Sequence, residues 1–238
     1  MPDRPPVLLA VFAHPDDETF RCGGLLALLA GRDVQVNILT ATRGEAGSCG
    51  DPPLCKVDQL AEVREKELRC ACAVLGIEPP SFLDYLDGKL AEVDEEEAIA
   101  KITTVSRELC PQVLLTWPAD GLSGHPDHKT VSRWTLLAFE EMAKDTEAPT
   151  ALYQMAVPQS VANALSLVEL HAIPDAEISV TVDVMPVWKQ KRSAINCHRS
   201  QADSSPILFA PEEKQRIFFG KEYFRRVCAR EGDDFLCA

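Results

Sequence analysis

The sequence is constrained most by residues 7–18, where an apolar run ends abruptly in a cluster of polar side chains. Residues 7–13 read VLLAVFA and show no polar alternation, which is typical of a buried parallel strand. The letters HPDDE follow at 14–18, and two glycines then lead into an apolar helix. In open α/β sheets, ligands bind at the carboxyl ends of the strands. Because three crowded carboxylates repel one another unless a cation neutralises them, we interpret this cluster as half of a metal site.

The length and composition of the chain indicate a single domain. With 238 residues, 46% of them hydrophobic, the chain can bury one sizeable core, and we expect one domain over residues 1–238. The net charge of −13 argues against nucleic acid and anionic membranes as partners. No apolar stretch reaches the length of a transmembrane helix, and the N-terminus indicates a strand instead of a signal peptide.

The nine cysteines are scattered, and their odd number suits a reducing compartment better than a disulfide framework, so we expect a cytoplasmic protein. Cys70 and Cys72 lie in a helical run, where cysteine behaves as a small core residue. Cys49 and Cys55 flank one loop and could form a bridge or bind a metal, but no second pair supports zinc.

The order of the remaining elements predicts an α/β fold. The patterns predict strands at 33–42, within 79–90, at 112–118, within 151–158 and at 177–184. They predict helices at 58–76, 92–109, 126–144 and 185–201, with Asp58 as the cap of the first and Gly76 as its end. A short helix and a terminal segment close the chain from residue 211. Strands alternating with helices favour a doubly wound domain with a mostly parallel sheet, extended by a C-terminal β/α segment.

A second polar cluster follows the strand predicted at 112–118. His125 and His128 stand three residues apart at the head of a helix, which places both imidazoles on one face. His14 and Asp17 have the same offset after the first strand, so the two clusters should converge across the sheet. Two histidines and one carboxylate leave an open coordination position, as in a catalytic metal site. The alternative is a helix-capping histidine and a solvated acidic loop.

Several motifs, in order along nearly the whole chain, resemble the LmbE-like/PIG-L family. They are AHPDDE at 13–18, LTATRGEAG at 39–47, LAEVREKELRCACAVLG at 60–76, LDG at 86–88, GHPDH at 124–128 and HRSQ at 198–201. The resemblance implies a Rossmann-like fold and zinc-dependent hydrolysis of an N-acyl group, usually the acetyl group of a glucosamine. Members include the deacetylases of mycothiol, bacillithiol and glycosylphosphatidylinositol biosynthesis.

The resemblance also implies roles for the residues of the two clusters. The implied metal ligands are His14, Asp17 and His128. Asp16 would be the general base, since it can take a proton from water that zinc has acidified. His125 would stabilise the oxyanion or protonate the departing amine. Asp127 could hold the imidazole of His125 and raise its pKa.

Four further residues are candidates for contact with the substrate. Arg64 and Asp87 correspond to family positions that touch the sugar, although a helical ion pair and a turn would also explain them. Arg43 faces the same crevice and could bind a hydroxyl or a phosphate, or form a loop salt bridge. His198 could approach the site from the C-terminal part, or end a surface helix.

Four other positions carry more specific expectations. Ser123 stands where some relatives carry a tyrosine, so that role is vacant or is taken by another group. Arg21 lies near the metal loop and would favour an anionic substrate. Glu18 is an outer-shell partner or a helix-capping carboxylate, and Trp117 is more typical of the core than of a sugar platform.

The sequence therefore predicts a hydrolase that uses Zn²⁺, with Fe²⁺ or another divalent metal as the alternative cofactor, and a small amino-sugar substrate. Homo-oligomers are frequent among relatives, so a homo-oligomer is possible here. A second hypothesis is an Fe(II) oxygenase, since two histidines and one carboxylate also suit iron. A third is a catalytically silent metal- or sugar-binding protein.

Overall fold

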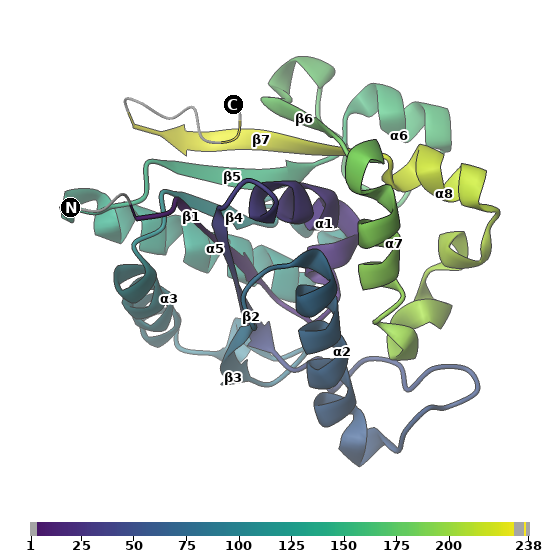
Figure 1. Cartoon of the computed structure of the whole chain (residues 1–238). Coiled ribbons are helices and arrows are strands. Elements are labelled where there is room, and N and C mark those ends of the chain that lie inside the picture. Colours follow the sequence, from purple (N-terminus) through teal and green to yellow (C-terminus); the bar gives the residue numbers. More distant parts are fainter. Residues whose placement is uncertain (1–3, 231–235, 237–238) are drawn as a thin grey trace.

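The computed structural model describes residues 4–230 and residue 236, and it contains one seven-stranded sheet in the order β3-β2-β1-β4-β5-β7-β6 (Figure 1). The strands are β1 Val7–Phe12, β2 Gln35–Thr42, β3 Ser81–Tyr85, β4 Val113–Thr116, β5 Ala151–Ala156, β6 Val180–Asp183 and β7 Lys221–Ala229. The first five are parallel, while β7 runs antiparallel to both β5 and β6. The predicted α/β fold with a mostly parallel sheet is confirmed.

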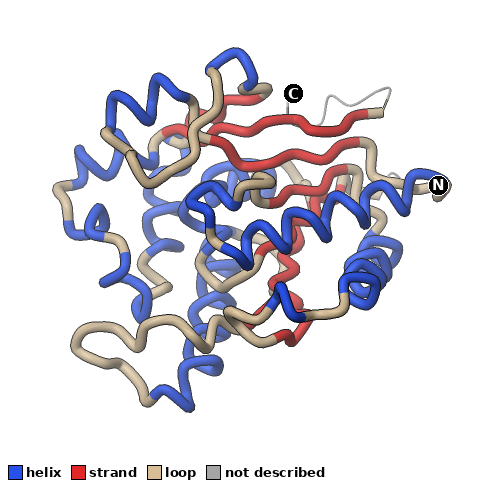
Figure 2. The backbone as a smooth tube through the Cα atoms, turned by 180° about the vertical axis from the view of Figure 1, so that it is seen from behind, coloured by secondary structure: helices blue, strands red, loops and turns tan. Residues whose placement is uncertain are grey.

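Helices cover both faces of the sheet (Figures 1 and 2). The α-helices are α1 Asp17–Ala30, α2 Leu60–Leu75, α3 Glu95–Leu109, α4 Gly121–Gly124, α5 Pro126–Glu141, α6 Gln159–Leu165, α7 Trp188–Ile195 and α8 Glu212–Phe219. Short 3₁₀ turns are η1 Val57–Gln59, η2 Leu90–Glu92, η3 Met142–Lys144, η4 Asp175–Glu177, η5 Met185–Val187, η6 Arg199–Ser204 and η7 Pro206–Phe209.

The strand β1 lies between β2 and β4 and is buried along its whole length. Leu8, Ala10 and Phe12 pack in the core cluster that contains residues of α1, α2 and α7. Leu9 and Val11 belong to the opposite cluster, with residues of α3 and α5. Because a central strand must be apolar on both faces, β1 shows no alternation in its sequence. Its carboxyl end therefore opens between two helical layers.

Gly24 in α1 allows another segment to pack closely against the helix. A Cβ atom there would lie 2.5 Å from the side chain of Val184, which follows β6. The buried Glu222 of β7 also accepts hydrogen bonds from the backbone N–H groups of Gly24 and Leu25, both at 2.7 Å. The C-terminal strands are thus fastened to α1, which carries the first polar cluster at its N-terminus.

The structure corrects three expectations about local structure. The terminal segment forms β7, a strand inserted between β5 and β6, because the backbone of residues 221–229 pairs on both sides. Asp58 does not cap α2, since it lies inside η1 and Gln59 precedes the helix. The helix predicted at 185–201 is divided into η5, α7 and η6.

The expectation that Cys70 is a core residue is wrong. Cys70 is exposed on α2 and forms a disulfide with Cys197, whereas Cys72 is buried as expected. Cys49 and Cys55 are both free, and Cys237 lies outside the described residues. The disulfide removes the argument from cysteine usage for a reducing compartment, and the cytoplasmic location stays a prediction.

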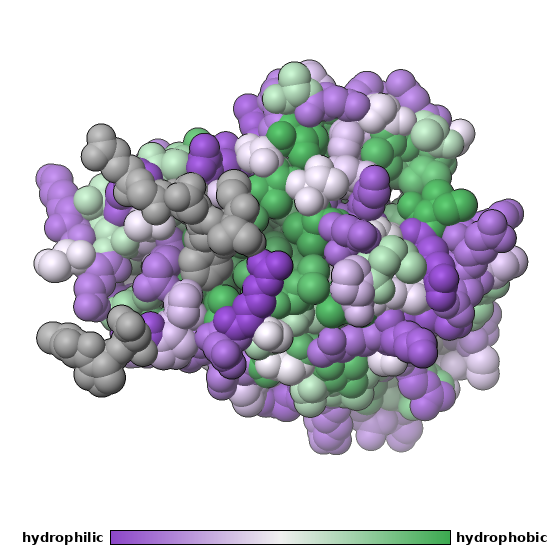
Figure 3. All heavy atoms as spheres, turned by 45° about the horizontal axis from the view of Figure 1, so that its top comes forward, coloured by the Kyte–Doolittle hydropathy of each residue, from purple (hydrophilic) through white to green (hydrophobic). Residues whose placement is uncertain are grey.

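The surface seen from the side of β6 and β7 is hydrophilic at its margins, with apolar residues gathered across its middle (Figure 3). Among the described residues, no helix combines the length and the apolar character needed to cross a bilayer.

Candidate metal centre

The two polar clusters meet at the carboxyl ends of β1 and β4. His14 follows β1 directly, and Asp17 opens α1. His125 is the N-cap of α5, and Pro126 occupies the first turn of the helix. Because β1 and β4 are parallel neighbours, the segments that follow them lie at the same edge of the sheet. The predicted convergence of the two clusters is therefore present in the structure.

Three side chains bring donor atoms together in this crevice. Nδ1 of His14 lies 3.3 Å from Nε2 of His128, and Oδ1 of Asp17 lies 3.5 Å from the same Nε2. One ligand atom from each residue lies within 4.8 Å of the others. His14 and Asp17 are buried. The set offers two nitrogens and one oxygen, the ligand types found in catalytic divalent-metal sites.

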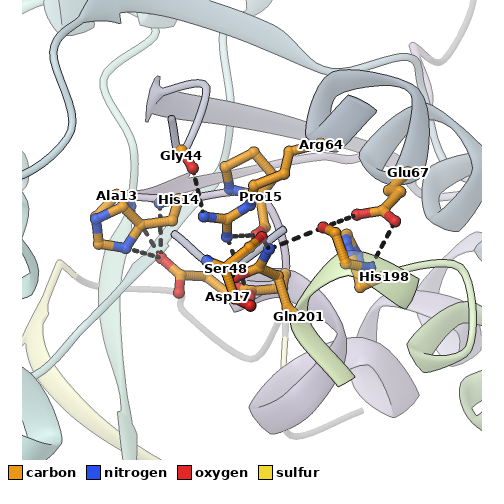
Figure 4. A network of polar contacts seen from close by, with 12 residues as sticks. Ala13, His14, Pro15, Asp17, Gly44, Ser48, Arg64, Glu67, His198 and Gln201 are labelled. Carbon is orange, nitrogen blue, oxygen red and sulfur yellow. Dashed lines mark hydrogen bonds and ion pairs between the residues drawn. The ribbon is translucent and has the colours of Figure 1, made fainter. Parts of the chain in front are cut away.

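The other oxygen of Asp17 is fully engaged by the protein. Its Oδ2 accepts hydrogen bonds from the backbone N–H groups of Ala13 and His14, both at 3.0 Å (Figure 4). It also accepts one from Nε1 of Trp117 at 3.0 Å. These donors, together with the imidazoles nearby, overcome the effect of burial and lower the pKa of Asp17 far below its ordinary value. Asp17 therefore presents Oδ1 as a charged ligand.

The outer nitrogens of both ligand histidines have hydrogen-bond acceptors. Nε2 of His14 lies 3.0 Å from Asp87 and 3.3 Å from Asp127, and Nδ1 of His128 lies 3.3 Å from the carbonyl oxygen of Gly121. An N–H at each outer position leaves a lone pair on the inner nitrogen, which is the tautomer that a metal requires. The residues present therefore fit a divalent metal ion.

The protonation of His14 is governed by the two carboxylates at its outer nitrogen. Burial by itself lowers the pKa of His14, but hydrogen bonds to Asp127 and Asp87 outweigh it and raise the pKa to about 10. Both carboxylates lie at the outer nitrogen, Nε2, so they stabilise positive charge on the imidazole itself, while the inner nitrogen, Nδ1, faces His128.

Asp16 lies beside the ligands with its carboxylate partly accessible, at 20% side-chain exposure. Its φ angle of 115° is in the left-handed region, which costs a non-glycine residue about 1–3 kcal/mol. Burial of the carboxyl raises its pKa to about 6, although Arg64, 3.2 Å away, acts in the opposite direction. A carboxylate with such a pKa can accept a proton near neutral pH.

His125 is held by a backbone group instead of the expected carboxylate. Its Nδ1 accepts a hydrogen bond from the backbone N–H of Asp127 at 3.2 Å, while the Asp127 carboxylate turns to His14 and to the N–H of Gly88 at 2.7 Å. Burial, His128 and His14 lower the pKa of His125. The expectation that the Asp127 carboxylate holds the His125 imidazole is wrong, because this carboxylate contacts His14 and the N–H of Gly88. Its negative charge does act to raise the pKa of His125, as expected, but burial and the two neighbouring histidines outweigh it.

Three of the expected substrate contacts are close to the centre, but their side chains are turned into the protein. Arg64 is 4% exposed and donates to the carbonyls of Gly44 and Pro15 and to Asp16. Asp87 contacts His14 and accepts from the N–H of Ala46. Most of the polar atoms of these two side chains therefore already have protein partners, including His14 and Asp16.

His198 is the third of these residues, and it is buried at 1% exposure. Its Nε2 lies 2.6 Å from Oε1 of Glu18, whose other oxygen accepts from the N–H of Asp16 at 3.0 Å. Glu18 is therefore not a partner of a ligand histidine. The structure does not place the imidazole of His198 at a substrate-accessible surface or at the end of a surface helix.

Arg43 and Arg21 point away from the metal cluster. Arg43 forms ion pairs with Glu65 and Asp84 and lies over the ring of Phe82, which is the loop salt bridge that the sequence left open. Arg21 lies over the ring of Phe218 in α8, 4.9 Å from its centroid. The expectation that Arg21 favours an anionic substrate loses its structural basis, because its guanidinium packs over Phe218 and interacts with the carboxylate of Glu222.

Sequence reasoning missed the contribution of Trp117. This side chain is buried, as expected, but it donates to Asp17 and stacks on His128 with ring centroids 3.9 Å apart. Its position directly after β4, in the same crevice as the ligands, was the available signal. The links between Ser200 and Glu67, at 2.6 and 2.8 Å, were also missed, although both residues lie in motifs that carry the family resemblance.

An open α/β sheet with this ligand cluster and an adjacent base defines a metal-dependent hydrolase. Residues 9–139, more than half of the chain, match the family described as PIG-L, GlcNAc-PI de-N-acetylase. The chain belongs to the PIG-L family and is a metal-dependent de-N-acetylase.

Individual relatives agree with this assignment. The 1D-myo-inositol 2-acetamido-2-deoxy-alpha-D-glucopyranoside deacetylase of Salinispora arenicola (strain CNS-205) is 31% identical, and the match covers 98% of this chain and 87% of that protein. The solved N,N'-diacetylchitobiose deacetylase from Pyrococcus horikoshii has a TM-score of 0.70 at 20% identity, covering 93% of this chain and 84% of that one.

The same fold also occurs in an enzyme of another class. The 4-carboxy-2-hydroxymuconate hydratase from Pseudomonas putida KT2440 has a TM-score of 0.69 at 18% identity, covering 96% of this chain and 98% of that one. The architecture alone therefore does not decide the reaction. The family match and the residues of the site carry the assignment.

Proposed function

We propose that the protein removes the acetyl group from an N-acetylglucosaminyl conjugate with a small polyol aglycone, and that its metal is zinc. The arrangement of His14, Asp17 and His128 next to the accessible carboxylate of Asp16 is the observation that carries this proposal. The names of the relatives at about 30% identity support an inositol glycoside as the first substrate to test.

Each residue has a role that follows from its contacts. When bound, the metal would acidify water and polarise the acetamide carbonyl. Asp16 accepts the proton of the attacking water and can return it to the departing amine. Since Nδ1 of His125 accepts a hydrogen bond, its proton lies on Nε2, which donates to the developing oxyanion. Asp87 and Asp127 keep His14 in the tautomer that binds the metal.

The test is release of a free amine by metal-free protein and by the same protein after addition of Zn²⁺ or Fe²⁺. The panel contains the inositol and malate glycosides of N-acetylglucosamine, free N-acetylglucosamine and diacetylchitobiose. We expect amine release from the inositol glycoside that depends on zinc. Stronger activity with another glycoside would change the proposed aglycone, and activity restored by iron alone would change the proposed metal. Absence of amine release with every compound and both metals would overturn the proposed function.

A further inference from the structure

We propose that His198, acting through Glu18, is a positioning residue that holds the backbone of Asp16 in its left-handed conformation. In this conformation the Asp16 carboxylate lies 3.2 Å from Arg64, on the residue that directly precedes the proposed ligand Asp17. The inference rests on the proposed role of Asp16 as the base. It assigns to a buried histidine of the C-terminal segment a part in the reaction that does not involve contact with the substrate.

The starting point is the strained backbone of Asp16. Its φ of 115° and ψ of −25° are unusual for a residue with a side chain, and such a conformation persists only where neighbouring groups hold it. The Asp16 carbonyl accepts from the N–H and hydroxyl of Thr19, both at 3.0 Å. The Asp16 N–H donates to Oε2 of Glu18 at 3.0 Å. Glu18 therefore holds the N-terminal side of this turn.

The carboxylate of Glu18 itself needs a partner that fixes its position. It is 1% exposed, and a buried carboxylate needs a partner that compensates its charge. Nε2 of His198 lies 2.6 Å from Oε1, which leaves Oε2 free to accept from Asp16. Without His198, Glu18 would lose the partner of Oε1 and its carboxylate would be free to rotate, which weakens its hold on the Asp16 N–H.

The chain around His198 is fastened to α2 at two points. Cys197 forms the disulfide with Cys70, and Ser200 donates to Glu67 through both its N–H and its hydroxyl (Figure 4 shows His198, Gln201 and Glu67). Gln201 adds a bond to the carbonyl of Ser48 at 2.7 Å. The backbone that carries the His198 imidazole is therefore held in place, and none of these contacts involves a proposed metal ligand.

One face of α2 connects this segment to the carboxylate of Asp16. Arg64, Glu67 and Cys70 stand three residues apart along the helix and therefore share a face. Arg64 holds the Asp16 carboxylate, while Glu67 and Cys70 hold the segment that contains His198. The same helix thus fixes the side chain of the base directly and its backbone through His198 and Glu18.

The experiment compares His198→Leu, which removes the donor, with His198→Gln, which keeps an N–H near the position of Nε2. We expect His198→Leu to lower kcat about 10- to 100-fold with KM and zinc content unchanged, and His198→Gln to restore most of the loss. Gln215→Leu is the matched control, because Gln215 is a buried polar residue whose amide donates to the carbonyls of Leu208 and Ala210, just before α8. It should lower stability and leave kcat unchanged.

A double-mutant cycle with Asp16→Asn separates positioning from general structural damage. If His198 acts through the base, His198→Leu should have no further effect once Asp16 is Asn. A loss of the same size in both backgrounds, or a rise in KM at constant kcat, would overturn the proposal. If His198→Leu does not fold, Glu18→Gln replaces it, because the two donors use different oxygens of Glu18 and the amide nitrogen of glutamine cannot accept a hydrogen bond.

A crystal structure of the zinc-loaded variants provides a readout that does not depend on activity. In His198→Leu we expect Asp16 to leave the left-handed region and to lose its contact with Glu18, whereas His198→Gln retains both. An unchanged Asp16 in His198→Leu would overturn the proposal. A wild-type protein that releases no amine would overturn the proposed function, and the two structures would still decide whether His198 positions Asp16.

Discussion

The two sides of the metal centre differ in how their polar atoms are used. On the ligand side, formed by His14, Asp17 and His128, each residue has one atom engaged by the protein and one atom directed at the other ligands. On the base side, formed by Asp16, Glu18, Arg64 and His198, most polar atoms bond to other protein groups. The ligand side thus directs three donor atoms toward one another, whereas the base side directs most of its polar atoms into the protein.

The two sides of the centre are therefore expected to contribute to two different properties, metal affinity and turnover. The ligand side supplies affinity for the metal, so changes there should alter metal content and activity together. The base side holds one carboxylate in a fixed conformation, so changes there should alter turnover while the metal stays bound. The following predictions test this separation.

The largest effect is expected for His128→Ala. Removal of Nε2 leaves one nitrogen and one carboxylate, so zinc should no longer bind at one ion per chain, and activity should fall on the order of 10³-fold or more. Metal analysis after dialysis and amine release measure the two effects. His125→Ala is the control, since its ring lies 4.5 Å from His128 but outside the ligand cluster, and it should keep its zinc. A His128→Ala protein with full zinc content would show that His128 is not a metal ligand.

For Asp16→Asn we expect a large loss of turnover without a loss of metal. The amide keeps the size of the side chain but cannot accept a proton, so kcat should fall about 10²- to 10⁴-fold while zinc content stays at the wild-type level. Single-turnover amine release and metal analysis on the same sample are the measurements. Full activity of this variant would show that another residue is the base. Loss of zinc would show that Asp16 also contributes to metal affinity, which would contradict the separation between the two sides.

An intermediate effect is expected for Trp117→Phe. Phenylalanine retains an aromatic ring beside His128 but removes one of three donors to Oδ2 of Asp17. Mutation of a group that orients a metal ligand typically weakens metal binding 10- to 100-fold. Since two donors to Oδ2 of Asp17 remain, we expect zinc binding to be about tenfold weaker. Competition with a chromophoric chelator measures it. Trp134→Phe, a buried tryptophan against Tyr85, is the control, and equal affinities of the two variants would contradict the role of the indole N–H.

The ligand side could be predicted from the sequence because it follows from topology. His14 and His128 are far apart in the chain, yet each follows a strand whose apolar run is unmistakable, and parallel neighbours place their carboxyl ends together. The family resemblance then supplied the roles. The convergence of the clusters and the α/β fold can therefore both be predicted from the sequence alone.

The base side could be predicted only in part, because its function lies in side-chain direction and in contacts between distant segments. The sequence places Arg64 on a helix but does not say that its guanidinium is buried against Asp16. The pairing of Cys70 with Cys197 joins residues 127 positions apart, and no local pattern indicates it. The strand β7 was missed for a related reason, since its pairing partners β5 and β6, and not its composition, define it.

The smallest effect is expected in the pH dependence of stability at His198. Burial lowers the pKa of this imidazole, but Glu18, Asp16 and Glu67 together raise it above the ordinary value. The imidazolium therefore stabilises the folded protein fully below the unfolded pKa of about 6.5, and this contribution is lost as the pH rises through the higher folded value. Thermal unfolding of wild type and His198→Gln between pH 5 and pH 9 measures it.

The comparison isolates His198, because glutamine does not titrate and all other groups, including the metal ligands, are common to both proteins. We expect wild type to exceed His198→Gln in Tm most strongly at low pH, with a difference that shrinks as the pH rises; a domain of this size changes by about 2–4 °C for each kcal/mol. A difference that stays constant or grows with pH would mean that the imidazole is neutral in the folded state. The Glu18 carboxylate would then need another source of positive charge, and the base side would depend on the metal after all.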